Sequence, residues 1–222
     1  MRSTYCSISR RFTISAEITS FVDAWQTQTE AALNARGRSV EINTYAPSPT
    51  SAALLTTLVA ATGAKAVVEV GSGTGISGLA IFAGMADDGI LTTIDVDAAH
   101  QSAAKAAFSA ASIDSGRARL ITGAPQEVLP RLTDAAYDVV VINDPSADPQ
   151  GYFDQALRLL RVGGVVVLAR ALGEGSKVAD SGQRDPQTTA LRELGEAAKA
   201  QEGTVSALIP LDEGTLVAVK QA

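Results

Sequence analysis

Residues 67–77 constrain the fold of this chain more than any other segment, and they read VVEVGSGTGIS. An apolar, β-branched run leads to a carboxylate, then to three glycines at alternate positions, and then to a stretch that favours helix. In parallel α/β sheets this order builds a ligand site. A buried strand ends in a tight turn, glycines let the ligand approach the backbone, and the next helix points its N-terminus at the ligand. The segment therefore predicts an α/β fold with a nucleotide-sized ligand.

The rest of the chain supports this class, because short apolar runs alternate with helical stretches. The runs predicted as buried strands are 66–70, 90–95, 118–122, 137–142 and 164–169, with helices predicted at 75–85, 98–112, 125–132 and 150–161. Such repeated units predict a doubly wound, mostly parallel α/β sheet with right-handed crossovers.

The C-terminal part departs from this alternation. A polar, Gly/Asp-rich segment at 173–185 is expected to be a mobile loop, and a helix is predicted at about 187–200. Two apolar runs, 204–210 and 215–220, flank Leu-Asp-Glu-Gly and predict an antiparallel hairpin. The sheet is therefore expected to have seven strands.

The N-terminal part is polar and rich in Ser and Thr. One helix is predicted from Ala16 to Asn34, with Gly37 as its C-terminal cap, and a second from about residue 47 to Thr62, ended by Gly63. We expect residues 1–45 to form an N-terminal helical extension and residues 46–222 to form the ligand-binding domain.

Composition excludes several classes of function. The formal net charge of −6 argues against nucleic acid or a membrane surface as the main partner. One cysteine, Cys6, and one histidine, His100, form neither an internal disulfide nor a zinc site. No apolar run approaches the roughly 18 residues of a membrane span, and the first residues do not read as a signal peptide. A cytoplasmic location is expected.

The glycine loop admits two ligands. Residues 73–78 match the dinucleotide pattern G-x-G-x-x-G, and Asp95 follows 22 residues after Gly73. Read from Gly71, however, the spacing is G-x-G-x-G, and Gly78 falls inside the helix. Glu69 would repel a pyrophosphate but would attract a ligand with positive charge. S-adenosylmethionine, with a sulfonium and an ammonium group, fits better than NAD; a loop that serves only as a tight turn is the third interpretation.

Two further segments are expected to complete the ligand site. Asp95, at the tip of the second strand, can accept both ribose hydroxyls, or it can cap the following helix. The segment after the third strand contains Ala124, Pro125 and Gln126, which either contact the adenine or simply start a helix. The residues expected to bind the methyl donor are Glu69, Gly71, Ser72, Gly73, Gly75, Ser77, Asp95, Ala124, Pro125 and Gln126.

These motifs together resemble the small class I O-methyltransferases of the catechol and caffeoyl-CoA type, whose sheets also finish in an antiparallel hairpin. The resemblance is carried by residues 47–55, 68–77, 94–97, 123–130, 137–143 and 159–167. It is closest to a bacterial branch that lacks the metal ligands. It implies S-adenosylmethionine as methyl donor, a small-molecule acceptor and a homodimer, with the N-terminal segment contributing to the acceptor pocket.

The departures from that family concern its metal site. Metal-dependent members end the fourth strand in Asp, followed three residues later by Lys, where this chain has Asn143 and Ser146. They end the fifth strand in Asp-Asn, where this chain has Ala169 and Arg170. A hard divalent cation prefers several oxygen ligands with carboxylates among them. We therefore expect no metal site; Asp144 would serve as a ligand only if the strand slipped by one residue.

The catalytic candidates are Arg170, Asn143 and Asp144. Arg170 either anchors an anionic acceptor in place of the metal or is a surface or interface arginine. Asp144 and Asp148 either accept a proton or fix turns, and His100 is expected to be a surface or packing residue. The leading hypothesis is metal-independent O-methylation of a small molecule. The alternatives are a catalytically weak, donor-binding regulatory protein and an NAD-linked oxidoreductase, although the latter lacks a Tyr-x-x-x-Lys pair.

Overall fold

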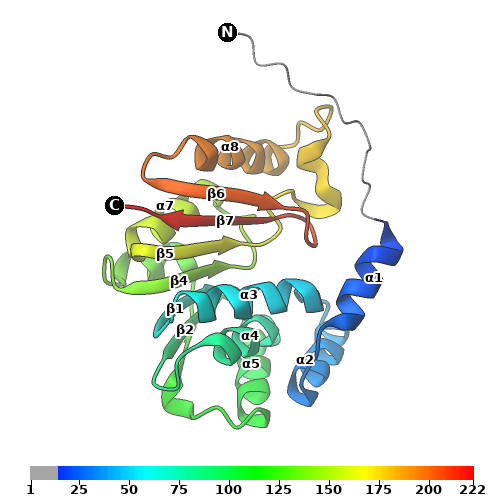
Figure 1. Cartoon of the computed structure of the whole chain (residues 1–222), viewed down its shortest axis with the longest axis vertical. Coiled ribbons are helices and arrows are strands. Elements are labelled where there is room, and N and C mark those ends of the chain that lie inside the picture. The colour runs from blue at the N-terminus through cyan, green and yellow to red at the C-terminus, as the bar shows by residue number, and fades with distance from the viewer. Residues whose placement is uncertain (1–14) are drawn as a thin grey trace.

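A seven-stranded sheet forms the centre of residues 15–222, the part of the chain that the computed structural model describes (Figure 1). Its order is β3-β2-β1-β4-β5-β7-β6. The strands are β1 Ala66–Val70, β2 Ile90–Asp95, β3 Ala118–Thr122, β4 Tyr137–Ile142, β5 Leu160–Leu168, β6 Thr204–Ile209 and β7 Thr215–Lys220. The expectation concerning Cys6 lies outside the described residues.

The sheet places its topological switch point at β1. This strand pairs in parallel with β2 on one side and with β4 on the other. The chain therefore adds β2 and β3 on one side of β1 and then crosses back to add β4 and β5 on the other side. Ligands of open α/β sheets bind at the carboxyl ends of strands at such a point. Strand β7 pairs antiparallel with β6, with which it forms a hairpin, and with β5. The predicted fold class and the closing hairpin are confirmed.

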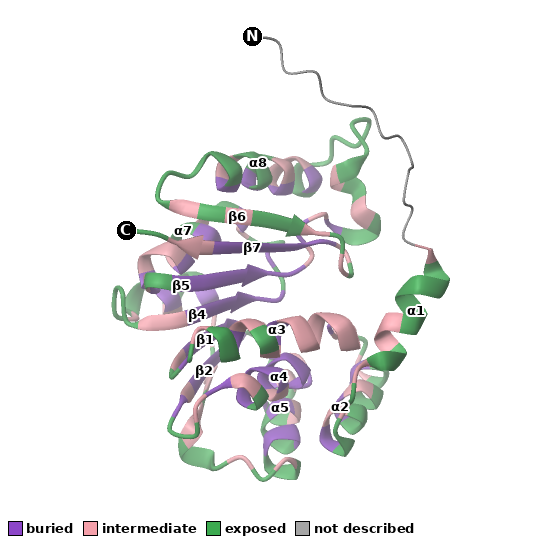
Figure 2. Ribbon diagram, in the orientation of Figure 1, coloured by how far each residue is buried: buried purple, intermediate pink, exposed green. Residues whose placement is uncertain are grey.

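Alternating side chains of the strands divide the core between the two faces of the sheet. On one face, Val67, Leu91 and Val139 pack with α3 (Pro49–Ala61), α4 (Ile76–Gly84) and α5 (Ala98–Ala110). On the other face, Val68 and Val140 pack with α7 (Pro149–Leu159) and α8 (Pro186–Ala200). The short helix α6 (Pro125–Val128) follows β3. Figure 2 shows the resulting buried centre between the helices.

The predicted boundaries of the first four strands match the structure, because each is a short run of mostly apolar and β-branched residues that is followed by a turn. The fifth strand differs, since β5 begins at Leu160, four residues before the predicted start. Its pairing with β4 shifts register between Tyr137 and Val139, and this irregularity accommodates Gly163 and Gly164 within the strand. A 3₁₀ segment, Glu174–Ala179, occupies part of the segment expected to be a mobile loop.

The single N-terminal helix predicted from Ala16 to Asn34 is wrong. The chain forms two helices, α1 (Ala16–Trp25) and α2 (Glu30–Glu41), and Gly37 lies inside α2 rather than capping it. The break occurs because Thr29 takes an extended conformation and its hydroxyl accepts a hydrogen bond from the backbone N–H of Ala32, which starts a new helix.

Helix α1 rests on the rest of the structure through few contacts. None of its residues is buried, and Phe21 and Trp25 are 73% and 75% exposed (Figure 2). Its anchor is Asp23, whose carboxylate accepts hydrogen bonds from the backbone and side chain of Thr50 at the start of α3. No helix among residues 15–222 is both long enough and apolar enough to cross a membrane.

Close packing of α3 against α4 generates a first prediction. A methyl group at Gly84 would collide with the carbonyl oxygen of Thr56, so Gly84→Ala is expected to lower the free energy of unfolding by about 2 kcal/mol. Gly195→Ala is the control, because Gly195 lies in α8 with open space around it. That change is expected to raise the same free energy by about 0.5–1 kcal/mol through helix propensity. Urea denaturation of both variants measures the difference; equal effects would contradict the packing argument.

Candidate functional site

The glycine loop after β1 adopts a conformation that requires glycine at alternate positions. Gly71, Gly73 and Gly75 have φ angles of +86°, +47° and +88°. A side chain at Gly75 would also meet the backbone of Ala104 in α5 at 2.9 Å. Gly78, in contrast, lies within α4, where its missing side chain makes room for the ring of Phe108. The structure thus matches the G-x-G-x-G register that starts at Gly71.

Glu69 lies beneath this loop with no exposed surface. The hydroxyl of Thr93 donates to its carboxylate over 2.6 Å, and Asn143 Nδ2 lies 3.3 Å from the other oxygen. Burial raises the pKa of Glu69 to about 7, against the lowering effect of hydrogen bonds from Ser77, Thr93 and Asn143 and with a further rise from the nearby charge of Asp95.

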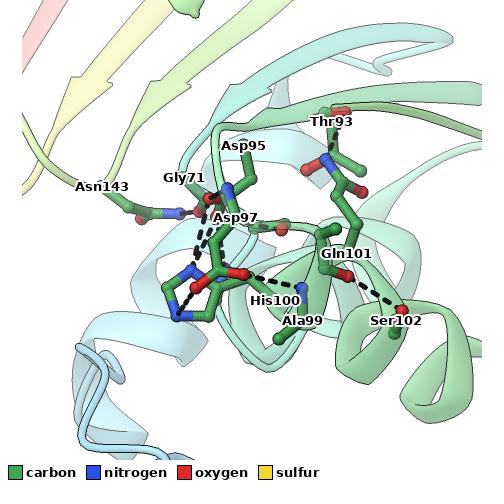
Figure 3. A network of polar contacts seen from close by, with 12 residues as sticks. Gly71, Thr93, Asp95, Asp97, Ala99, His100, Gln101, Ser102 and Asn143 are labelled. Carbon is green, nitrogen blue, oxygen red and sulfur yellow. Dashed lines mark hydrogen bonds and ion pairs between the residues drawn. The ribbon is translucent and has the colours of Figure 1, made fainter. Parts of the chain in front are cut away.

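Asn143, at the end of β4, is turned towards the glycine loop. Its Nδ2 donates to the carbonyl oxygen of Gly71 over 2.7 Å and to Ser77 Oγ over 2.9 Å, besides its contact with Glu69. Figure 3 shows the contact between Asn143 and Gly71. One amide therefore ties the end of β4 to the end of β1 and to the first turn of α4.

Asp95, at the tip of β2, is the centre of a second polar network (Figure 3). Its Oδ2 accepts hydrogen bonds from Ser72 Oγ and from the backbone N–H of Gly73, and its Oδ1 accepts the backbone N–H of Asp97. His100 Nδ1 lies 3.2 Å from Asp95 Oδ2. His100, expected to be a surface or packing residue, is partly exposed and packs against Asp95, because α5 begins so soon after Asp95 that its first turn faces that carboxylate.

A cavity of about 560 Å³ lies over the carboxyl ends of β1, β2 and β4, a volume typical of small-molecule sites. Most of the predicted site residues line it: Gly71, Ser72, Gly73, Ser77, Asp95, Pro125, Gln126, Asn143, Asp144 and Arg170. Glu69, Gly75 and Ala124 are not among the lining residues. Glu69 adjoins the cavity through Ser77 and Asn143, and Ala124 precedes the first turn of α6.

The cavity lining also contains residues that were not among the predicted site residues. Asn43, Thr44, Tyr45 and Pro47, from the connection between α2 and α3, belong to it, as do His100 beside Asp95 and Tyr152 beside Gln126. The connection has no recognisable motif, and it reaches the cavity because Tyr45 and Ser48 bind Asp212 in the β6–β7 turn.

Arg170 follows β5 and lines the same cavity. Its Nε donates to Glu213 Oε2 over 2.7 Å, and its guanidinium carbon lies 5.5 Å from the centre of the Tyr45 ring. Asp144 Oδ1 accepts the backbone N–H of Ser146, and Asp148 caps α7. Both aspartates therefore fix turns. Among residues 15–222 no group of three or more His, Cys, Asp or Glu side chains is placed to hold a metal ion.

Comparison with known proteins decides the family. A family model described as O-methyltransferase matches residues 27–221. The chain belongs to the O-methyltransferase family. A candidate O-methyltransferase of Mycobacterium marinum is 45% identical over 186 residues, which cover 84% of this chain and 83% of that protein. A candidate O-methyltransferase of Mycolicibacterium vanbaalenii is 46% identical over the same length, covering 84% and 82%.

Solved structures agree on the fold of this O-methyltransferase. A protein of Corynebacterium glutamicum is 33% identical with a TM-score of 0.86, covering 93% of this chain and 96% of that one. The O-methyltransferase TomG of Streptomyces achromogenes, solved with S-adenosylmethionine, is 23% identical with a TM-score of 0.82, covering 92% and 95%. The predicted enzyme class, an O-methyltransferase that uses S-adenosylmethionine, is confirmed by the family.

The buried carboxylate of Glu69 generates a second prediction. Because its pKa is about 7 in the folded chain and 4.5 otherwise, it stabilises the fold fully only below pH 4.5 and loses that contribution as the pH rises through 7. Glu69→Gln removes this titration. Between pH 5 and pH 8 the unfolding free energy of the natural protein should therefore fall relative to the variant, by at most on the order of 3 kcal/mol. Denaturation across that range checks it, and parallel curves would contradict it.

Proposed function

We propose that this O-methyltransferase transfers the methyl group of S-adenosylmethionine to a hydroxyl oxygen of a small molecule without a divalent metal ion. The observation that carries the proposal is the amide of Asn143, which is engaged by the glycine loop at the strand end where the metal-dependent members of the family have a carboxylate ligand. The donor site is thus intact, and the metal site is not.

The donor end of the cavity fits the chemistry of S-adenosylmethionine. Asp95 offers a carboxylate for the ribose hydroxyls, and Pro125 and Gln126 lie where an adenine would be held. Glu69 is one layer below the cavity, so we assign it an indirect role. It orients Ser77 and Asn143, and its negative charge attracts the cationic methionine part through the low dielectric of the core.

The chain itself has to align the acceptor and exclude water. When bound, the donor supplies an electrophilic methyl carbon. The acceptor oxygen forms the new bond as the carbon–sulfur bond breaks, and the electron pair of that bond stays on sulfur. Tyr45 and Pro47, which line the cavity, are our candidates for walls that orient the acceptor and exclude water. Asp144 lines the same cavity and is our candidate for receiving the hydroxyl proton.

The side chains at the ends of β4 and β5, where the family's metal ligands would stand, support metal independence. Asn143 directs its N–H₂ group into the loop, Ala169 offers a methyl group, and Arg170 brings a cation. Asp144 follows the strand and binds the backbone of Ser146. A hard divalent cation needs several oxygen ligands, and these residues do not supply such a set.

The two alternative functions are an NAD-linked oxidoreductase and a donor-binding regulatory protein. An NAD-linked oxidoreductase disagrees with the family and with the position of Gly78 inside α4. A donor-binding regulatory protein with weak catalysis is separated from an enzyme only by measured turnover. The homodimer, the cytoplasmic location and the boundary between an extension at 1–45 and a domain at 46–222 stay predictions.

A matched pair of isosteric changes tests the donor site. Asp95→Asn is expected to weaken binding of S-adenosylhomocysteine at least tenfold, because a charge-assisted bond to the ribose is lost. Asp97→Asn should leave the affinity unchanged, since asparagine also caps α5 well. Calorimetry with S-adenosylhomocysteine and with NAD measures both. Tight NAD binding with none of S-adenosylhomocysteine would refute the proposal.

Metal removal tests the other half of the proposal. Turnover against a panel of hydroxylated acceptors, followed as S-adenosylhomocysteine release, should change less than about twofold when EDTA or Mg²⁺ is added, because the residues at the strand ends do not form a ligand set. Metal content is measured on the same sample. Activity that disappears with the chelator and returns with Mg²⁺ would show that the metal-independent mechanism is wrong.

A further inference from the structure

One arginine side chain supplies the positive charge in the lining of the cavity. Arg170 is the one arginine or lysine among the described residues that line the cavity, whereas its acidic lining residues are Asp95 at the donor end and Asp144 near Arg170. Carboxylates therefore lie near both ends of the cavity, with Asp95 and the buried Glu69 at the donor end and Asp144 and Glu213 near Arg170, but the guanidinium is found at one end only.

Arg170 is held in place by its own neighbours. Its backbone lies in the left-handed region at φ +57°, which a residue with a side chain adopts only when its surroundings impose it. Its Nε binds Glu213 Oε2, and Glu213 Oε1 accepts the backbone N–H of Gly175 over 3.2 Å. Glu213 is therefore fixed through both oxygens and keeps the guanidinium in one orientation.

This arrangement uses only part of the guanidinium. The Nε group is satisfied by Glu213, while neither Nη group has a hydrogen-bond partner among the described residues, and the side chain is 26% exposed. A guanidinium can bind a second carboxylate through its remaining N–H groups. The free groups belong to a residue that lines the cavity.

An aromatic wall stands beside the guanidinium. The Tyr45 ring lies against Arg170, and its hydroxyl donates to Asp212 Oδ2 over 3.3 Å, which fixes the plane of the ring. Burial, with Asp212, raises the pKa of Tyr45 far above its usual value, so the phenol keeps its proton. Pro47 and Ala147 add apolar surface to the same cavity.

Desolvation decides which acceptor such a site selects. Any molecule that fills this end removes water from the Nη groups of Arg170, and an acceptor without oxygens to meet them leaves charged donors unpaired at a substantial cost. A cationic group placed against these N–H groups offers them no lone pair and leaves them unpaired. Flat apolar walls favour a planar ring.

From this juxtaposition we infer that the acceptor is an aromatic hydroxycarboxylate, whose carboxylate binds the Nη groups of Arg170 and whose hydroxyl points towards the donor. The inference rests on the proposed function, since it concerns the acceptor of the same reaction. It assigns Arg170 a binding role that sets specificity, and it leaves the methyl transfer step unchanged.

Calorimetry on the full chain saturated with S-adenosylhomocysteine tests this inference. The probes are 2-, 3- and 4-hydroxybenzoate, with phenol as the neutral analogue and tyramine as the cationic one. At least one hydroxybenzoate is expected to bind tenfold or more tightly than phenol, and tyramine should not bind measurably. Arg170→Gln should remove this preference while leaving the affinity for phenol and for S-adenosylhomocysteine within about threefold. Arg131→Gln, on the exposed surface, is the matched control and should change nothing.

The outcomes separate the inference from the proposed function. If S-adenosylhomocysteine does not bind, the proposed function fails. If it binds but the hydroxybenzoates bind no better than phenol, or if Arg170→Gln keeps the preference, the inference is overturned. Should that variant fail to fold, Arg170→Lys decides. It keeps the charge but not the planar fork, and a preference reduced at least threefold supports the inference whereas an unchanged one overturns it.

Discussion

The site depends on the way in which a buried negative charge at the switch point of the sheet is compensated. Glu69 has no exposed surface, and the side chains that meet it come from β2, from the end of β4 and from the first turn of α4. Desolvation makes such a carboxylate costly unless its hydrogen bonds are made. The hydrogen bonds that satisfy Glu69 also fix the positions of three neighbouring elements, so the glycine loop is held in its conformation before any ligand arrives.

The same network explains how one amide changes the chemistry of the neighbouring site. Asn143 has a donor group that a carboxylate lacks, and that group binds the carbonyl oxygen of Gly71 and the hydroxyl of Ser77. An aspartate at this position would place a second negative charge beside Glu69. Asparagine therefore stabilises the glycine loop and stands where a carboxylate would carry a second negative charge. The cation at the other end of the cavity is supplied by Arg170, which a carboxylate of the chain already holds in place.

Much of this fold could be predicted from the sequence, because the parallel strands are short runs of mostly apolar and β-branched residues and the glycine loop has a fixed spacing. Asp95 could be predicted for the same reason, since a carboxylate at the end of a predicted strand is recognisable in the sequence. The break at Thr29 was missed because a single side-chain cap outweighed a continuing helical pattern. Tyr45 was missed because its position depends on packing between distant segments, since it meets Asp212, which lies 167 residues away in the sequence.

The two ends of the cavity are built from different parts of the chain. The donor end is built from β1, β2, β4 and the loops between them, all of which precede residue 144. The end that contains Tyr45 and Arg170 needs the β6–β7 turn, where Asp212 binds Tyr45 and Glu213 binds Arg170. Contacts between remote segments close late in folding, and a chain made on the ribosome emerges from its N-terminus. A growing chain therefore contains all of the residues for the donor end well before it contains those that complete the acceptor end. Recognition of the acceptor becomes a property of the finished molecule alone.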